Sequence, residues 1–147
     1  MEVRAINTVV ERDIQEIISD SQIFDAFRGK LILVTGATGL IGSMVARSLV
    51  AANDAYHLSL HVICHVRNIE KAHFMFGDIL NSQAITFVDR PLDSLTVACD
   101  YIMHGAAPTK SKYFVEHPVD TIRTSIHGTE RMLELGKEQR ILGMVYL

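Results

Sequence analysis

Residues 31–42 read Leu-Ile-Leu-Val-Thr-Gly-Ala-Thr-Gly-Leu-Ile-Gly, and this stretch decides the fold. Its first five residues form an apolar, β-branched run, which is typical of a strand buried on both faces of a parallel sheet. Three glycines at three-residue spacing follow, and residues 40–52 then carry apolar side chains at helical spacing. The stretch therefore predicts a strand, a tight glycine turn and a helix.

The three glycines have distinct predicted roles. Gly36 lets the chain turn sharply off the strand, Gly39 lets the backbone approach a pyrophosphate, and Gly42 lets the helix pack closely on the sheet. The amides and dipole of the new helix favour phosphate charge. A plain strand-to-helix turn that uses glycine for tightness is the alternative. The position between a buried-type strand and an amphipathic helix favours dinucleotide binding.

The alternation of strand and helix continues along the chain. Strands are predicted at 58–66, 84–88, 100–104 and 141–147 and helices at 69–76 and 118–138, whereas 92–98 is ambiguous. Such alternation indicates βαβ units with right-handed crossovers and a mostly parallel sheet. We therefore predict an α/β fold, a Rossmann-type doubly wound sheet of about five strands in the order 3-2-1-4-5. Its ligand would bind where the order reverses, between the first and fourth strands.

An extra helical segment precedes the first strand. Residues 8–27 carry apolar side chains at three- and four-residue spacing, and Asp20 or Ser21 is expected to break the segment into two pieces. We expect its apolar stripe to pack on the sheet edge or on a neighbouring subunit. Residues 1–28 would then form an N-terminal helical extension.

Composition excludes several classes of protein. Of the 147 residues, 48% are hydrophobic and 21% charged, which fits one globular domain and excludes disorder. The net charge of -3 leaves no basic excess for nucleic acid, and no segment is apolar enough to span a membrane. Cys64 and Cys99 lie in apolar runs typical of buried reduced thiols, so we expect a cytoplasmic protein. His61 and His65 lack partners at a recognisable ligand spacing, so no metal site is expected.

The second predicted strand ends in Cys-His-Val-Arg-Asn at 64–68, where this fold reads the adenosine ribose. An acidic residue there favours NAD, and an arginine can pair with the 2′-phosphate of NADP. None of residues 64–69 is acidic, and the first acidic residue after the strand is Glu70. Arg67 therefore favours NADP, or stacks on the adenine of either cofactor, and a solvated arginine at the sheet edge is the alternative.

Three motifs together resemble the NAD-dependent epimerase/dehydratase family of extended short-chain dehydrogenases/reductases. The first is the glycine turn. Residues 100–107, DYIMHGAA, are similar to the family's D-x-V-x-H-x-A-A. Residues 118–129, PVDTIRTSIHGT, are similar to P-x-x-x-x-x-x-N-x-x-G-T, with Ser125 in place of the asparagine. The Ala-Ala-Pro run followed by Lys-Tyr-Phe at 112–114 most resembles nucleotide-sugar decarboxylases and dehydratases.

The resemblance implies that residues 29–147 are an NAD(P)-binding domain and gives each matching residue a role. The residues that would hold the pyrophosphate are Gly36, Thr38, Gly39, Leu40, Ile41 and Gly42. Those that would line the ribose and phosphate are Ala106, Ala107 and Pro108, with His104 beneath them. Asp89 would contact the adenine, although Asp93 could be placed there instead and Asp89 could be a turn residue.

The family's catalytic pair, a tyrosine with a lysine four residues later, does not occur in these 147 residues. Tyr56, Tyr101 and Tyr113 lack a lysine at that spacing, and Tyr146 is the penultimate residue. We therefore expect a domain truncated before the catalytic segment, which binds a cofactor without turnover. A natural short protein is the alternative.

The resemblance implies that the full enzyme oxidises a nucleotide-sugar hydroxyl by transient hydride transfer to NAD or NADP, before epimerisation, dehydration or decarboxylation. Its partners would be that substrate and a second copy in a homodimer. Two alternatives stay open: a non-catalytic NAD(P)-sensing or interaction module, and a carbonyl or acyl-thioester reductase of the same superfamily. Lys110, Lys112 and Tyr113 would lie near a substrate diphosphate or sugar, or in a solvated loop.

Overall fold

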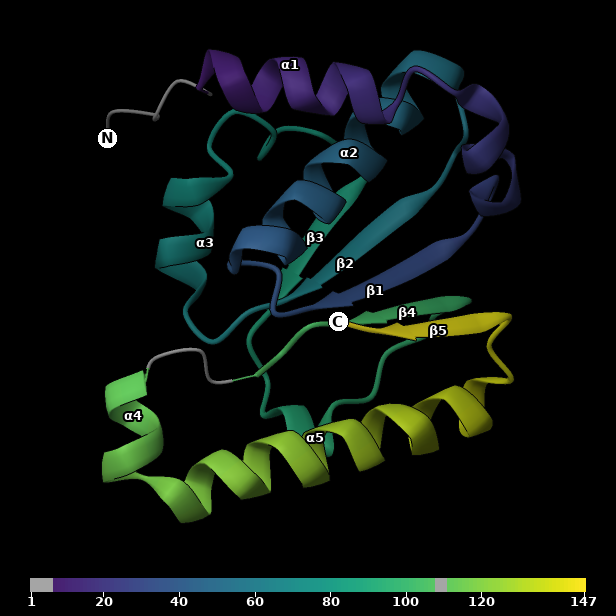
Figure 1. The fold of residues 1–147 in the computed structure, drawn as a ribbon. Coiled ribbons are helices and arrows are strands. Elements are labelled where there is room, and N and C mark those ends of the chain that lie inside the picture. Colours follow the sequence, from purple (N-terminus) through teal and green to yellow (C-terminus); the bar gives the residue numbers. More distant parts are fainter. Residues whose placement is uncertain (1–6, 108–110) are drawn as a thin grey trace.

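The five strands of the central sheet all run parallel, in the order β3-β2-β1-β4-β5. The computed structural model describes residues 7–107 and 111–147. Its elements are α1 (Thr8–Ile17), η1 (Ser21–Phe27), β1 (Leu31–Thr35), α2 (Leu40–Tyr56), β2 (His61–His65), α3 (Ile69–Met75), β3 (Ile85–Val88), η2 (Leu92–Ser94), β4 (Tyr101–His104), α4 (Ser111–Glu116), α5 (Pro118–Gln139) and β5 (Gly143–Tyr146). Figure 1 shows α1, α2 and α3 on one side of the sheet and α5 on the other. The predicted fold class and strand order are confirmed.

Strand β1 lies at the centre of the sheet because its side chains can be buried on both faces. Ile32 and Val34 pack in the cluster on the α2 side, whereas Leu33 packs with residues of η2, β4 and α5 on the other side. All three are fully buried. The parallel register aligns Thr35, at the end of β1, with His65 of β2 and with the last residue of β4. The carboxyl ends of these strands, which precede the candidate site, therefore lie side by side at one end of the sheet.

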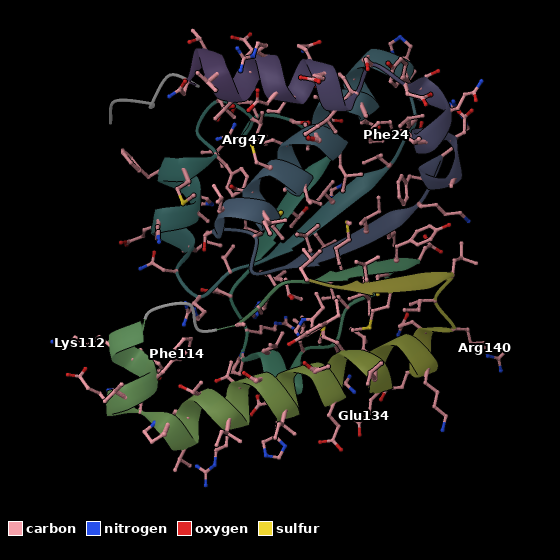
Figure 2. All side chains as sticks on the ribbon, viewed as in Figure 1. Phe24, Arg47, Lys112, Phe114, Glu134 and Arg140 are labelled. Atoms are coloured by element: carbon pink, nitrogen blue, oxygen red, sulfur yellow. The ribbon has the colours of Figure 1, made fainter. Side chains whose placement is uncertain are left out.

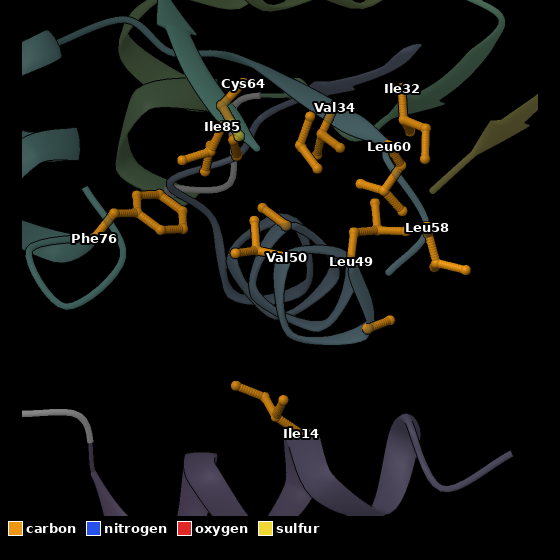
Figure 3. Packing of buried hydrophobic residues seen from close by; sticks show 14 of the residues in the cluster. Ile14, Ile32, Val34, Leu49, Val50, Leu58, Leu60, Cys64, Phe76 and Ile85 are labelled. Atoms are coloured by element: carbon orange, nitrogen blue, oxygen red, sulfur yellow. The ribbon is translucent and has the colours of Figure 1, made fainter. Parts of the chain in front are cut away.

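The N-terminal segment breaks where the sequence predicted, but it packs elsewhere. The side chain of Asp20 accepts a hydrogen bond from Gln22 N and begins η1, a 3-10 helix instead of a second α-helix. Helix α1 packs on the outer face of α2 and not on a sheet edge. Ile14 is buried there, and Figure 3 shows it directed at α2. The Tyr56 hydroxyl adds a hydrogen bond to the carbonyl of Ile18. The extension therefore shares a core with the sheet domain.

Strand β2 begins at His61, three residues later than predicted, and helices α2 and α4 also differ from the sequence prediction. Helix α2 continues to Tyr56 and ends at His57, which adopts a left-handed conformation with φ of 50°. The Asn53 side chain accepts a hydrogen bond from Leu60 N and turns the chain toward β2. Helix α4 was not predicted. Within the described residues no helix meets the length and apolarity that crossing a membrane requires.

Both cysteines are buried free thiols, as predicted. Burial raises the pKa of Cys64 to about 12. Burial and the nearby Asp100 raise the pKa of Cys99 to about 11. Neither thiol is therefore ionised to any useful extent at neutral pH.

Replacing Ile14 with alanine should destabilise the whole chain, because this side chain is 4% exposed in a core that includes the sheet. We expect a loss of about 2–4 kcal/mol in the free energy of unfolding. Val9→Ala is the matched control, since Val9 lies on the same helix and is 52% exposed. Urea denaturation followed by circular dichroism measures both. A separate early transition for α1 in the wild type would show instead that the extension folds independently.

Candidate functional site: the glycine turn at the strand reversal

The turn after β1 brings three backbone segments together without room for a side chain. Gly36 adopts a φ of 69°, which disfavours any residue with a Cβ. A Cβ on Gly36 would overlap the carbonyl of Gly105, which follows β4. A Cβ on Gly42, in the first turn of α2, would overlap the carbonyl of Gly36 itself. The glycines at these two positions therefore let the β1 turn, the β4 loop and α2 touch through their backbones.

Gly39 is the N-cap of α2, and no side chain caps this helix end. Its amide donates to the carbonyl of Gly36 at 2.9 Å, which closes the turn. A helix without a side-chain cap leaves amides of its first turn open to an external acceptor. Gly39, Leu40 and Ile41 are all exposed, whereas Thr38 is half-buried. The helix start is thus accessible and has a partial positive charge.

The other predicted site residues surround this turn to different degrees. His104 ends β4 and is fully buried, Ala106 is half-buried, and Ala107 is exposed. Arg67 and Asp89 are exposed and follow the carboxyl ends of β2 and β3, which lie on the same side of the sheet as the carboxyl end of β1 and the glycine turn. Asp93 is exposed in η2. Pro108 and Lys110 lie outside the described residues.

Lys112 and Tyr113, expected near a substrate or in a solvated loop, belong to helix α4. Lys112 lies 3.6 Å from Glu116, and 85% of its side chain is exposed. Figure 2 shows it extending away from the body of the molecule. Tyr113 packs on His117 with ring centroids 4.7 Å apart. Nothing in this geometry directs either side chain at the glycine turn.

Thr35 and Thr129, which the sequence analysis did not assign to the site, form hydrogen bonds with His104 behind the glycine turn. The Thr35 hydroxyl oxygen is 2.7 Å from His104 Nδ1 and accepts hydrogen bonds from the amides of Gly105, at 3.1 Å, and Ala106, at 3.2 Å. The other ring nitrogen of His104, Nε2, lies 3.1 Å from the Thr129 hydroxyl of α5. The sequence signal was the placement of Thr35 next to Gly36, but its partners are far away in the chain.

His65 ties the end of β2 to the loop after β3. Its Nε2 donates to the carbonyl of Arg90 at 2.8 Å, and the side chain is buried. Burial lowers the pKa of His65, and Arg67 lowers it further, although the Arg90 carbonyl and Asp89 act in the opposite direction. Burial also lowers the pKa of His104, and the nearby His65 adds to this shift. Both rings are therefore neutral at pH 7.

An apolar hollow of about 320 Å³ lies between η1, α2 and β4, and Ile41 of the first turn of α2 is part of its lining. Phe24, Met44 and Met103 contribute to its lining. The Ser48 hydroxyl, from α2, is buried and has no hydrogen-bond partner among the described residues. This apolar lining does not suit a pyrophosphate, so the glycine turn is the stronger candidate for a nucleotide site.

Together, the parallel sheet, the order reversal between β1 and β4, and the glycine turn at that reversal define a Rossmann-type α/β domain. The chain belongs to the NAD dependent epimerase/dehydratase family, whose family model matches residues 32–147. That match includes the glycine turn, the β4 loop and α5.

Two individual relatives are similar to most of this chain. The chain is 25% identical over 126 residues to the uncharacterized membrane protein MJ1061 of Methanocaldococcus jannaschii, covering 81% of this chain and 36% of that protein. It is 33% identical over 109 residues to a dTDP-glucose 4,6-dehydratase of Streptomyces antibioticus, covering 70% of this chain and 32% of that protein. The chain thus spans about a third of the length of these relatives.

A solved structure shows the same fold. The dTDP-glucose 4,6-dehydratase DesIV of Streptomyces venezuelae, crystallised with NAD and TYD bound, superposes with a TM-score of 0.64 at 21% identity. The match covers 78% of this chain and 37% of that one.

Acid should destabilise the protein because His65 and His104 are held neutral in the folded state. The unfolded chain binds protons at these residues below its ordinary histidine pKa of about 6.5, whereas the folded chain binds them only at lower pH. The free energy of unfolding should thus be unaffected above pH ~6.5 and fall below it, with a limiting slope of at most about 1.4 kcal/mol per pH unit for each histidine.

Denaturant titrations between pH ~7.5 and ~5.5 measure this slope. His65→Asn should remove one proton from the linkage and flatten the pH dependence, whatever its effect on absolute stability. A variant slope equal to that of the wild type would contradict the assignment.

Proposed function

We propose that the chain binds a dinucleotide, NAD or NADP, at the glycine turn. The observation that carries this proposal is the backbone packing at Gly36 and Gly42 beside the open, uncapped start of α2. Phosphates are acceptors that match free amides and a positive helix end. The NAD in the crystal structure of DesIV supports the same ligand class.

The residues present fit such a group. A Cβ at Gly39 would meet the Gly36 carbonyl at 3.1 Å and otherwise face open space, so the glycine keeps the area in front of α2 free of side-chain atoms. We assign pyrophosphate contacts to Gly36, Thr38, Gly39, Leu40, Ile41 and Gly42. We assign ribose, phosphate and adenine contacts to Arg67, Asp89, Ala106, Ala107 and Pro108, with His104 as their support. When bound, the nicotinamide would supply a reversible hydride acceptor.

In the longer enzyme, this domain would serve transient oxidation of a nucleotide sugar, in an epimerase, dehydratase or decarboxylase. The family match and the dehydratase relatives support this assignment. A non-catalytic NAD(P)-sensing or interaction module and a carbonyl or acyl-thioester reductase are the other candidates.

We also infer that residues 29–147 form one domain and that residues 1–28 form an extension before it. We further infer a cytoplasmic location, which the two buried free thiols favour.

Replacing Gly39 with alanine tests the cofactor site without backbone strain, because Gly39 has an extended backbone with φ of -78°. The added methyl group would stand in front of the α2 amides, so NADH affinity should fall at least about tenfold. Fluorescence titration measures it.

Gly29→Ala is the control. Gly29 has a strained φ of 69°, but no atom lies within 4 Å of the position that a Cβ would take, so alanine should cost about 1–2 kcal/mol of stability and leave binding intact. Equal affinities for the two variants would overturn the assignment. Titration with NADPH as well tests Arg67: a preference for NADH above about tenfold would contradict its pairing with a 2′-phosphate.

The outer face of α5 supports the homodimer as partner. Four apolar side chains form one exposed stripe, and these are Val119, Ile122, Ile126 and Leu133, each 57–60% exposed. Val119 and Leu133 lie seven residues on either side of Ile126. An antiparallel pair of α5 helices centred on Ile126 would therefore bring Val119 against Leu133 of a second copy, so the stripe is self-complementary.

Ile126→Asp should shift the dimer to monomer, because it buries two carboxylates at the centre of the pair. Thr124→Asp is the matched control, since Thr124 is exposed on a different face of the same helix. Size-exclusion chromatography with light scattering measures the molar mass of each variant and so distinguishes dimer from monomer. A monomeric wild type would exclude this interface.

A further inference from the structure

The hydrogen bonds around His104 can be assigned a direction from the number of protons available. The Thr129 hydroxyl lies 2.7 Å from the carbonyl of Ser125, to which it must donate its single proton. It can then only accept from His104 Nε2, at 3.1 Å. The α5 end of the network therefore requires a proton on Nε2.

The other end requires the same tautomer independently. The Thr35 hydroxyl oxygen already accepts from the amide of Ala106, and it shares the amide of Gly105 with the backbone carbonyl of Thr35, both at 3.1 Å. Its proton remains for His104 Nδ1, at 2.7 Å, so Nδ1 must be unprotonated. A ring with its proton on Nε2 alone satisfies every group in the network.

We propose that Thr129 and His104 are positioning residues that, through Thr35, fix the amides of Gly105 and Ala106 against the nucleotide turn. The inference rests on the proposed dinucleotide site and adds a role for α5 in it. The Gly105 carbonyl and the Ala106 amide pack against Gly36, with no room for a Cβ between them. Any shift in these amides is therefore transmitted to the turn.

The direction of the network explains why Thr129 matters at a distance. Without its hydroxyl, Nε2–H has no acceptor, and the proton is no longer held on that nitrogen. A proton on Nδ1 would need a lone pair of the Thr35 hydroxyl, and the amide of Ala106 would lose its acceptor, whereas the amide of Gly105 keeps the Thr35 carbonyl. The β4 loop would then be held less firmly beneath the cofactor.

Thr129→Val removes the hydroxyl at nearly constant volume, and Thr129→Ser keeps it. Thr121→Val is the matched control, because Thr121 makes the same bond to the carbonyl four residues earlier, at 2.9 Å, but is not part of the network. The measurements are the ¹⁵N histidine spectrum, amide exchange at Ala106, and NADH titration, all on the full chain.

We expect a single Nε2–H tautomer of His104 in the wild type, Thr129→Ser and Thr121→Val. Thr129→Val should mix the tautomers, speed exchange at Ala106 and weaken NADH binding up to about tenfold. A wild-type Nδ1–H tautomer, or a Thr129→Val variant with unchanged tautomer and exchange, would overturn the inference. If the wild type does not bind NADH, the proposed function fails, and the tautomer and exchange data still decide the network.

Discussion

The rest of the site depends on a close backbone approach at Gly36. Here the turn after β1 touches the loop after β4 and the first turn of α2, and no side-chain atom could be inserted between them. This contact joins strands whose connecting helices lie on opposite faces of the sheet, with α2 on one side and α5 on the other (Figure 1). A parallel sheet leaves a crevice where its order reverses in this way. The glycines thus place an open helix start at that crevice.

The polar groups behind the turn determine how firmly it is held. Leaving a buried hydroxyl or imidazole without a hydrogen-bond partner costs about 1–3 kcal/mol. Thr35, His104 and Thr129 satisfy one another and two loop amides. The network therefore links β1, β4 and α5 at the level of the turn. The same saturation disfavours a second proton on His104, in agreement with its lowered pKa.

The sequence predicted those features that are local. The run 31–42 specifies its own strand, turn and helix, and alternation of elements predicts the strand order through the handedness of βαβ units. The Thr35–His104 contact joins residues 69 positions apart, so it depends on the register between β1 and β4. The packing of α1 on α2 was missed for a similar reason. An amphipathic stripe shows that a helix is covered, but not which surface covers it.

Helix α4 shows a different limit. Its six residues are too short for hydrophobic periodicity to distinguish them from a loop.

His104 is the residue in this site that most resembles a general base, being a histidine beneath the proposed cofactor. The network argues against that role. Both ring nitrogens are engaged, and the low pKa makes the ring a weak base that is neutral throughout the physiological range. A base for sugar oxidation must also reach the substrate, whereas His104 is fully buried. On the proposed function, His104 therefore supports the dinucleotide site and is not the group that transfers the proton.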